Sequence, residues 1–268
     1  MKAIGLALSA LILLLHASAA AQDGWFCETH LEIGAEYSFF SYEEHDIDGA
    51  RLMNESGPMF GVRAQLIHPS PLYWRINGSY RWGELEYDGA TQGGTLLTAD
   101  TTDTLFDIEA VLGTDLIPDD PRAVIAFYSG LGFRRWDNEI LGPGGYPRQT
   151  DYIYLPVGLE FSGMLGSRGS WGVRGQLDLL VRGMVRSDFS EFSPETGVVK
   201  NTQTSGYGLN ASLFLRIGFG RSSIISVEPF IQYWQIDMSD VAVLADGTGM
   251  VEPANSTTVY GIAVSLMW

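Results

Sequence analysis

Apolar and polar residues alternate along almost the whole chain, with the period of two that an extended strand imposes on its two faces. Helical periodicity is nearly absent. Ten alternating segments are predicted, at approximately residues 28–45, 57–68, 72–87, 103–116, 122–138, 150–163, 170–187, 203–218, 224–238 and 255–268. Composition does not change between them, so we expect residues 22–268 to form one domain.

The connections between these segments alternate in length. Short turns rich in Pro, Gly, Asp and Ser occupy residues 68–71, 117–121, 164–169 and 219–223, and longer loops occupy 46–56, 88–102, 139–149, 188–202 and 239–254. Short turns at one end and long loops at the other are typical of barrels that span the outer membrane. The sequence therefore predicts an all-β fold: one antiparallel transmembrane β-barrel of about ten strands, with short periplasmic turns and five longer extracellular loops.

The two faces of each segment differ in polarity. In residues 72–87, Trp74, Ile76 and Trp82 share one face, and Arg75 and Arg81 lie on the other. A soluble sandwich would rarely expose so many arginines and acids at mid-strand, whereas a membrane barrel turns its polar face inward.

This assignment of faces places a balanced set of charges in the lumen. Eight arginines and eight acids are predicted to point inward: Arg63, Arg75, Arg81, Arg134, Arg174, Arg182, Arg186 and Arg216, with Glu32, Glu36, Asp107, Glu109, Asp115, Glu160, Asp178 and Glu228. Confined charges need partners, and arginine pairs with carboxylates in bidentate geometry. We interpret the set as a salt-bridged network that packs the lumen.

Glycines on the inward face leave a second interpretation open. Gly83, Gly113, Gly130, Gly132, Gly158 and Gly218 would leave a gap if the charged side chains did not fill it. The lumen would then be a narrow path, favouring cations because the rims are acidic. Pro156 and Pro229 lie inside predicted strands and suggest bulges, because proline lacks the N–H that a sheet needs.

The N-terminus and the net charge place the protein outside the cytoplasm and away from nucleic acid. Lys2, the apolar run of 13 residues from Ala3 to Leu15 and the small residues that follow predict a signal peptide over residues 1–21, cleaved after Ala19 to Ala21. The remaining chain carries 15 basic and 32 acidic residues, a net charge of −17, so it has no basic surface for phosphates. Cys27 is the only cysteine, which excludes an internal disulfide.

The last segment, "VYGIAVSLMW", places its large apolar residues on one face and ends on an aromatic residue. That face consists of Tyr260, Ile262, Val264, Leu266 and Trp268. It resembles the C-terminal signal of Gram-negative outer-membrane proteins, and the whole chain resembles the outer-membrane β-barrel superfamily. The resemblance implies periplasmic chaperones and the barrel-assembly machinery as partners during biogenesis, and outer-membrane lipid and lipopolysaccharide afterwards.

Within that superfamily, ten strands invite comparison with omptins and with ten-stranded surface adhesins. "YIYLPVGLEF" (152–161) and "VEPFIQYW" (227–234) resemble porin-like barrels more than an enzyme family.

The omptin resemblance would require an Asp–His pair facing an Asp pair at the extracellular rim, to activate a water molecule. Only His45 lies at that rim; Asp46 is beside it, and the acids that could lie across the mouth are Asp88, Asp103, Asp237 and Asp240. Ser41 is four residues from His45 on the same strand, about 13 Å away and too far for a hydrogen bond. "DIDG" (46–49) lacks the later ligands of a calcium loop. We expect no metal or cofactor.

Apolar residues in the fourth and fifth loops are candidates for contact with an extracellular ligand, which the sequence does not identify. They are Phe189, Phe192, Val241, Val243, Leu244, Met250 and Val251. They could form a contact surface, plug the barrel or rest in the outer leaflet. The leading hypothesis is a monomeric, non-enzymatic surface barrel, envelope-structural or adhesin-like. The alternatives are the narrow porin-like channel and, third, an omptin-like rim protease.

Overall fold

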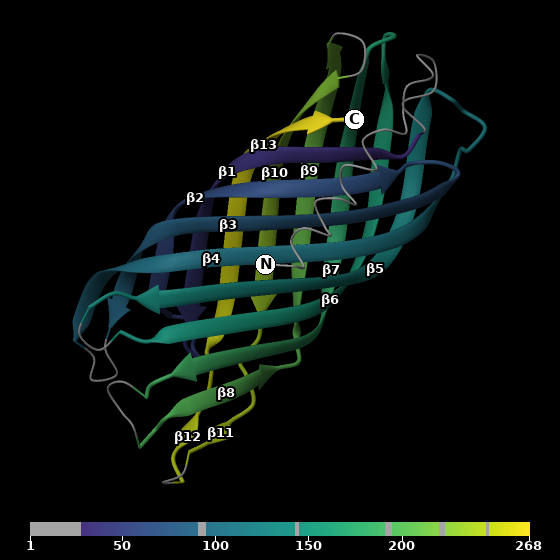
Figure 1. Ribbon diagram of the computed structural model, residues 1–268. Helices are drawn as coiled ribbons and strands as arrows, with labels where there is room; N and C mark the ends of the chain where they lie inside the picture. The colour runs from purple at the N-terminus through teal and green to yellow at the C-terminus, as the bar shows by residue number, and fades with distance from the viewer. Residues whose placement is uncertain (1–27, 91–94, 143–144, 191–194, 220–222, 245–246) are drawn as a thin grey trace, which may run out of the picture.

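The computed structural model describes residues 28–90, 95–142, 145–190, 195–219, 223–244 and 247–268. The predicted signal peptide and Cys27 lie outside the described residues. The strands, labelled as in Figure 1, are β1 (His30–His45), β2 (Arg51–His68), β3 (Leu72–Ala90), β4 (Leu96–Asp115), β5 (Ala123–Ile140), β6 (Pro147–Leu165), β7 (Gly169–Asp188), β8 (Val198–Gln203), β9 (Gly206–Phe219), β10 (Ser223–Ile236), β11 (Ala242–Val243), β12 (Gly249–Met250) and β13 (Ala254–Met267). The described residues form no helix that could cross a bilayer.

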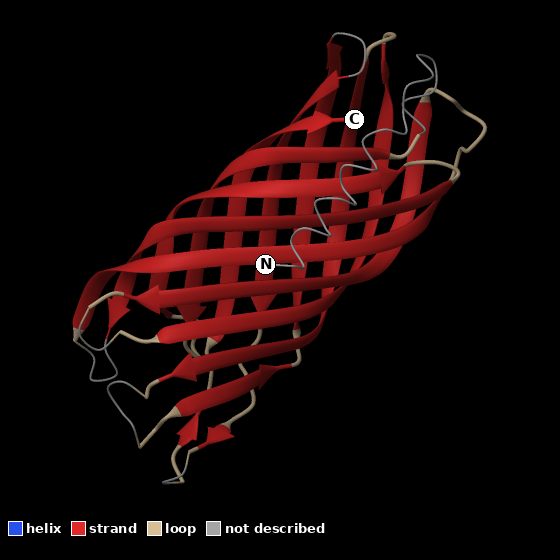
Figure 2. Cartoon of the chain, viewed as in Figure 1, coloured by secondary structure: helices blue, strands red, loops and turns tan. Residues whose placement is uncertain are grey.

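The long strands form one antiparallel sheet that closes on itself (Figure 2). The ring is completed by β13, which pairs with β10 on one side and with β1 on the other, where Phe39 lies opposite Tyr260. Because β8 and β9 pair with successive parts of β7, together they fill one position, and the barrel has ten. The predicted ten-stranded antiparallel barrel is confirmed.

The strands run further toward the extracellular end than the sequence predicted. Much of the predicted loops at 46–56, 88–102, 139–149 and 188–202 is strand. The turn between β1 and β2 spans only residues 46–50, and Asp46 Oδ1 fixes it by accepting hydrogen bonds from Asp48 N (2.9 Å) and Ala50 N (2.8 Å). The predicted limits were too short because they followed the apolar outward face, which ends before the strands do.

Outward side chains divide the barrel into two zones. We call the zone with apolar outward residues the membrane band; it comprises 31–39 of β1, 58–66 of β2, 72–82 of β3, 106–114 of β4, 125–133 of β5, 153–161 of β6, 171–179 of β7, 207–219 of β9, 225–233 of β10 and 260–268 of β13. Beyond it the same strands and β8 form the extracellular barrel, where most outward residues are polar and a few, such as Leu52, are apolar. On β3 the change falls between Trp82 and Glu84. Aromatic residues at this boundary are typical of membrane barrels.

A β-bulge on β7 reverses which of its residues face the lumen. Ile153 lies opposite Arg182, whereas Tyr154 lies opposite Leu180, so Val181 is an extra residue. The bulges expected at the two prolines are absent: Pro156 pairs with Asp178, and Pro229 with Ile262, without a change of register. That prediction was wrong, because each proline occupies its sheet position with one ladder hydrogen bond missing rather than with an inserted residue.

Candidate functional site

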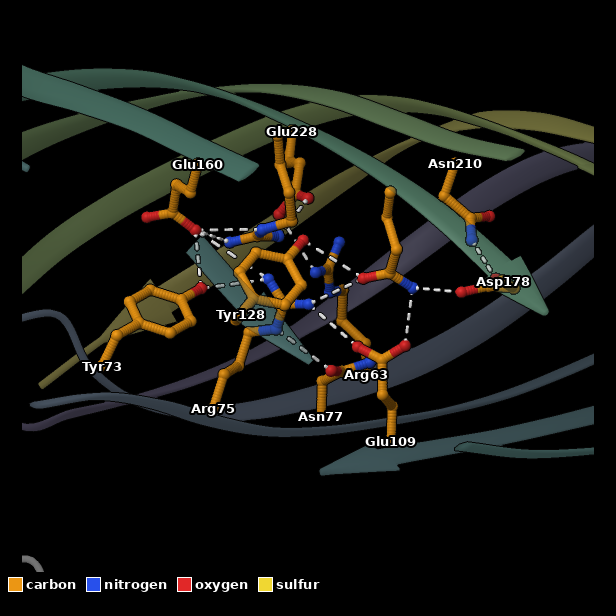
Figure 3. Close-up of polar contacts among 12 residues, drawn as sticks. Arg63, Tyr73, Arg75, Asn77, Glu109, Tyr128, Glu160, Asp178, Asn210 and Glu228 are labelled. Carbon is orange, nitrogen blue, oxygen red and sulfur yellow. Dashed lines mark hydrogen bonds and ion pairs between the residues drawn. The ribbon is translucent and has the colours of Figure 1, made fainter. Parts of the chain in front are cut away.

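Ion pairs between side chains from different strands cross the lumen of the membrane band. On β3, Arg81 contacts Glu36 of β1 at 2.6 Å and Asp107 of β4 at 3.1 Å. Arg75, six residues before Arg81 on β3, contacts Glu109 of β4 at 2.8 Å. Figure 3 shows Arg75 and Glu109 at the centre of a continuous set of polar contacts. The two arginines thus connect β3 with its neighbour β4 and, across β2, with β1.

Side chains from β1, β2, β5, β6, β7, β9 and β10 contribute the rest of the network. Its pairs are Arg174 with Glu160 (2.8 Å) and Glu228 (3.4 Å), Arg63 with Glu228 (3.0 Å), Arg216 with Glu32 (2.6 Å) and, back on β5, Arg134 with Asp107 (3.8 Å). Two predicted members lack an arginine contact among the described residues. Asp115 Oδ1 accepts hydrogen bonds from Ile117 N and Ile125 N, and Asp178 Oδ1 accepts one from Gln176 Nε2 (2.7 Å).

Arg182 and Arg186 do not belong to this network, so the prediction that they point inward was wrong. Both are exposed on the outer face of β7, and Arg186 pairs with Asp188 at 3.2 Å. The cause is the extra residue at Val181: beyond it, Gly183 and Val185 are buried and the arginines face outward. Strict alternation cannot reveal a bulge from one strand alone.

Neutral side chains that the sequence did not single out join the charges. Tyr73 Oη donates to Glu160 at 2.9 Å, and Tyr128 Oη donates to Gln176 Oε1 at 3.1 Å. Gln176 Nε2 then donates to Glu109 at 2.7 Å, and the Arg75 guanidinium lies 4.9 Å from the centre of the Tyr128 ring. The signal for Tyr73 and Gln176 would have been an inward position next to an inward charge on the same strand, and Tyr128 has no such neighbour on β5.

The space beside the inward glycines is occupied by neighbouring atoms. A Cβ at Gly132 would lie 2.1 Å from the ring of Tyr154, and one at Gly158 would lie 2.4 Å from the ring of Tyr128. Each tyrosine is the cross-strand partner of its glycine and lies over it. Built Cβ atoms at Gly83, Gly113, Gly130 and Gly218 likewise meet backbone atoms at 2.5, 2.1, 2.0 and 3.1 Å.

Little space remains among the luminal charges. A cavity of about 100 Å³ lies between Arg63, Arg75, Glu109, Gln176 and Asn210. A cavity of this size has room for water molecules. Its polar walls are suited to hold them, since buried waters bond to polar groups.

The lumen of the extracellular barrel is closed by apolar side chains. This extracellular plug consists of Phe40, Tyr42, Met53, Met59, Leu85, Tyr87, Leu105, Trp136 and Val259. Trp136 packs against Tyr42 and Phe40, with ring centres 4.6 and 5.2 Å apart. The plug and the charge network therefore occupy the same lumen at two levels.

One arginine that sequence reasoning missed joins the plug to the last loop. Arg148 of β6 donates to Glu44 Oε1 at 2.7 Å and to Tyr42 Oη at 2.8 Å, and it pairs with Glu252. Burial raises the pKa of the Tyr42 phenol, so it stays neutral beside Glu44. The signal was weak because Arg148 lies in a segment predicted to be loop.

The loop residues proposed for contacts have different environments. Val241, Val243 and Val251 are exposed, Val243 to 74%, on or beside the β11–β12 hairpin, which extends beyond the barrel at the lower end of Figure 1. Leu244 and Met250 are half-buried. Phe189 is instead 4% exposed and its ring lies 4.5 Å from that of Tyr146, which agrees with an inward position rather than with a contact surface. Phe192 lies outside the described residues.

The rim does not assemble a catalytic pair around His45. Its imidazole lies 3.7 Å from Glu43, the one carboxylate within ion-pair distance among the described residues, while Asp46 is engaged in its own turn. Asp88 faces outward, and Asp103 is buried in the plug region. No three His, Cys, Asp or Glu side chains in the described part of the chain are grouped to hold a metal ion.

The face of β13 that resembles the assembly signal lies on the outside of the barrel. Tyr260, Ile262, Val264, Leu266 and Trp268 are all exposed there. They continue the apolar surface of β1, since Tyr37 lies opposite Ile262 across the closing seam. This surface is the membrane band itself at the place where the barrel closes.

The fold is that of the outer-membrane β-barrel proteins. The chain is similar to the outer-membrane protease OmpT from Escherichia coli, with a TM-score of 0.63 and 9% identity over 90% of this chain and 96% of that one. Weaker similarities are found to OprG from Pseudomonas aeruginosa (TM-score 0.37, 10% identity, 92% and 97% covered) and to Ail from Yersinia pestis (TM-score 0.31, 11% identity, 90% and 99% covered). No protein-family model and no curated protein sequence matches the chain.

Proposed function

We propose that this protein is a non-enzymatic, surface-exposed barrel of the outer membrane, envelope-structural or adhesin-like, with a closed lumen. The observation that carries the proposal is the double obstruction of the lumen, by ion pairs in the membrane band and by the extracellular plug. Recognition falls to the β11–β12 hairpin, because it extends beyond the barrel and exposes Val241 and Val243.

Single-channel conductance of the refolded protein in a planar bilayer tests the closed lumen. We expect no conductance steps from a barrel whose folding is verified by heat-modifiable migration. Stable cation-selective steps would contradict the proposal and favour the narrow porin-like channel.

Replacing residues 241–251 by a short glycine linker tests the hairpin while keeping Glu252 and its contact with Arg148. We expect binding to host cells or matrix to be lost. Ile47→Ser is the matched control, because Ile47 is 86% exposed on a different loop. Unchanged binding after the loop replacement would exclude the hairpin as the recognition surface.

The surroundings of His45 support the non-enzymatic assignment. Among the described residues, its imidazole has one carboxylate within ion-pair distance, that of Glu43. We expect no cleavage of peptide substrates in the presence of lipopolysaccharide. Cleavage that His45→Ala abolishes would instead establish the rim protease.

The proposal includes export, in which a signal peptide over residues 1–21 is removed and periplasmic chaperones deliver the chain. The barrel-assembly machinery of a Gram-negative cell then recognises the outward face of β13. The mature monomer contacts outer-membrane lipid and lipopolysaccharide. N-terminal sequencing of the membrane form should begin between residues 20 and 22.

A further inference from the structure

Two buried carboxyl groups, those of Glu55 and Asp103, lie side by side in the extracellular barrel. Glu55 of β2 is 0% exposed and Asp103 of β4 is 1% exposed, and neither forms an ion pair with any described residue. Their outward neighbours, Ser56 and Thr102 among them, are polar, so the pair lies outside the membrane band. Unpaired buried carboxylates are costly, and such groups commonly bind a proton instead.

The hydroxyl of Thr101 shows where a proton must be. Its Oγ1 lies 2.7 Å from Glu55 Oε1 and 2.5 Å from Asp103 Oδ2. A hydroxyl has one hydrogen and can donate only one of these bonds, so the other bond requires a hydrogen on a carboxyl group. Trp136 Nε1 donates to Asp103 at 2.7 Å, which favours the charge on Asp103 and the proton on Glu55.

We propose that Glu55 and Asp103 form a proton-binding site and that the bound proton holds the extracellular plug closed. The site joins three strands: Glu55 on β2, Thr101 and Asp103 on β4, and Trp136 with Asn138 on β5, where Asn138 Nδ2 donates to Glu55 Oε2 at 3.2 Å. Burial and the adjacent Asp103 raise the pKa of Glu55 well above its usual range, and burial raises the pKa of Asp103.

Other ionisable groups that face the site do not neutralise it. Arg148 on β6 is the facing cation, and it is already held by Tyr42 and Glu44 of β1 and by Glu252 of the last loop. Tyr87 of β3 packs in the same plug, and burial raises the pKa of its phenol, so the side chain stays neutral. If both carboxyl groups were ionised, the second negative charge would therefore lie among apolar side chains.

The direction of the pH effect follows from the raised pKa of Glu55. The folded state retains a proton that the opened state releases, so the plug is most stable below the ordinary glutamate pKa of about 4.3 and weakens as pH rises toward the raised pKa. Within that window one retained proton changes the opening equilibrium about tenfold per pH unit. Above the raised pKa the effect levels off.

Infrared spectroscopy of the refolded wild-type protein at neutral pH tests the site. We expect the C=O stretch of a protonated carboxyl that is lost in Glu55→Gln and kept in Glu86→Gln. Glu86 is the matched control because it is exposed on the outer face of β3, opposite Ser56. A wild-type spectrum without the band at neutral pH overturns the proposal.

Hydrogen exchange tests the control of the plug. After correction for intrinsic exchange, protection of residues 51–57 and 97–104 should fall about tenfold per pH unit in wild type and in Glu86→Gln. It should not change with pH in Glu55→Gln, whose amide is neutral at every pH and can still donate to Thr101. Equal pH dependence in wild type and Glu55→Gln overturns the proposal, whichever carboxyl the spectra show protonated.

Discussion

The membrane band and the extracellular barrel share strands but differ in what crosses their lumen: ion pairs connect the strands of the band, and an apolar plug fills the extracellular barrel. On β3, Arg75 and Arg81 point into the lumen of the band beneath apolar outward residues, whereas further along Leu85 and Tyr87 point inward beneath Glu84 and Glu86. Lipid outside requires an apolar surface and leaves polar groups to be satisfied within. Water outside allows the ordinary arrangement, an apolar core under a polar surface.

The two zones therefore depend on different energies. The band is packed by ion pairs whose loss leaves an uncompensated charge, and the extracellular barrel is packed by apolar contacts whose loss leaves a cavity. Substitutions in each zone, each with a control on the outer face, measure how far this division holds.

The largest effect is expected in the band, from Arg174→Ala. Arg174 is buried and pairs with both Glu160 and Glu228, so its removal leaves two carboxylates short of a partner. We expect a loss of about 3–5 kcal/mol in the free energy of unfolding, measured by urea titration in detergent micelles. Arg135→Ala, which removes the partly exposed pair with Asp151, should cost about 1 kcal/mol or less. Equal losses would refute the assignment of stability to buried pairs.

In the extracellular barrel, Leu105→Ala should cost about 2–5 kcal/mol by the same titration, because it opens a cavity in the plug. Leu52→Ala is the control, since Leu52 is 45% exposed on the outer face of β2, and it should change stability by about 0.5 kcal/mol or less. A small effect at Leu105 would mean that the plug adjusts without an apolar core.

The next largest effect is expected from adding a methyl group at a luminal glycine. Gly158→Ala forces the ring of Tyr128 away from the backbone and should cost about 1–3 kcal/mol. Gly175→Ala lies on the next strand but meets no atom within 4 Å on the outer face, so it should be neutral or slightly stabilising. If both variants unfold at the same urea concentration, the tyrosine does not require the glycine.

The smallest effect is expected from Arg182→Ala and Arg186→Ala, about 0.5 kcal/mol or less each, because the bulge at Val181 turns both side chains outward. A loss of several kcal/mol from either would place it back in the luminal network, against the register of β6 and β7.

The sequence by itself determined the strands, the closure of the ring and the outward face of the last strand. These follow from alternation, because an extended backbone turns successive side chains to opposite faces wherever it lies. Alternation also placed 14 of the 16 predicted charges correctly in the lumen, although the prediction did not include the buried Glu55, Asp103 and Arg148. It erred at Arg182 and Arg186, where one inserted residue reverses the parity of everything that follows.

Only the tertiary structure decided what fills the lumen. Gly158 beneath Tyr128, Arg148 between Glu44 and the last loop, and the pairing of Glu55 with Asp103 each depend on which strands are neighbours and in which register. A period of two shows which face of its strand a residue occupies. It shows neither the residue's cross-strand partner nor whether lipid or water lies outside the barrel. The plug is apolar, unlike the charge network of the band, because its strands face water rather than lipid. For that reason it could be identified only from the closed barrel.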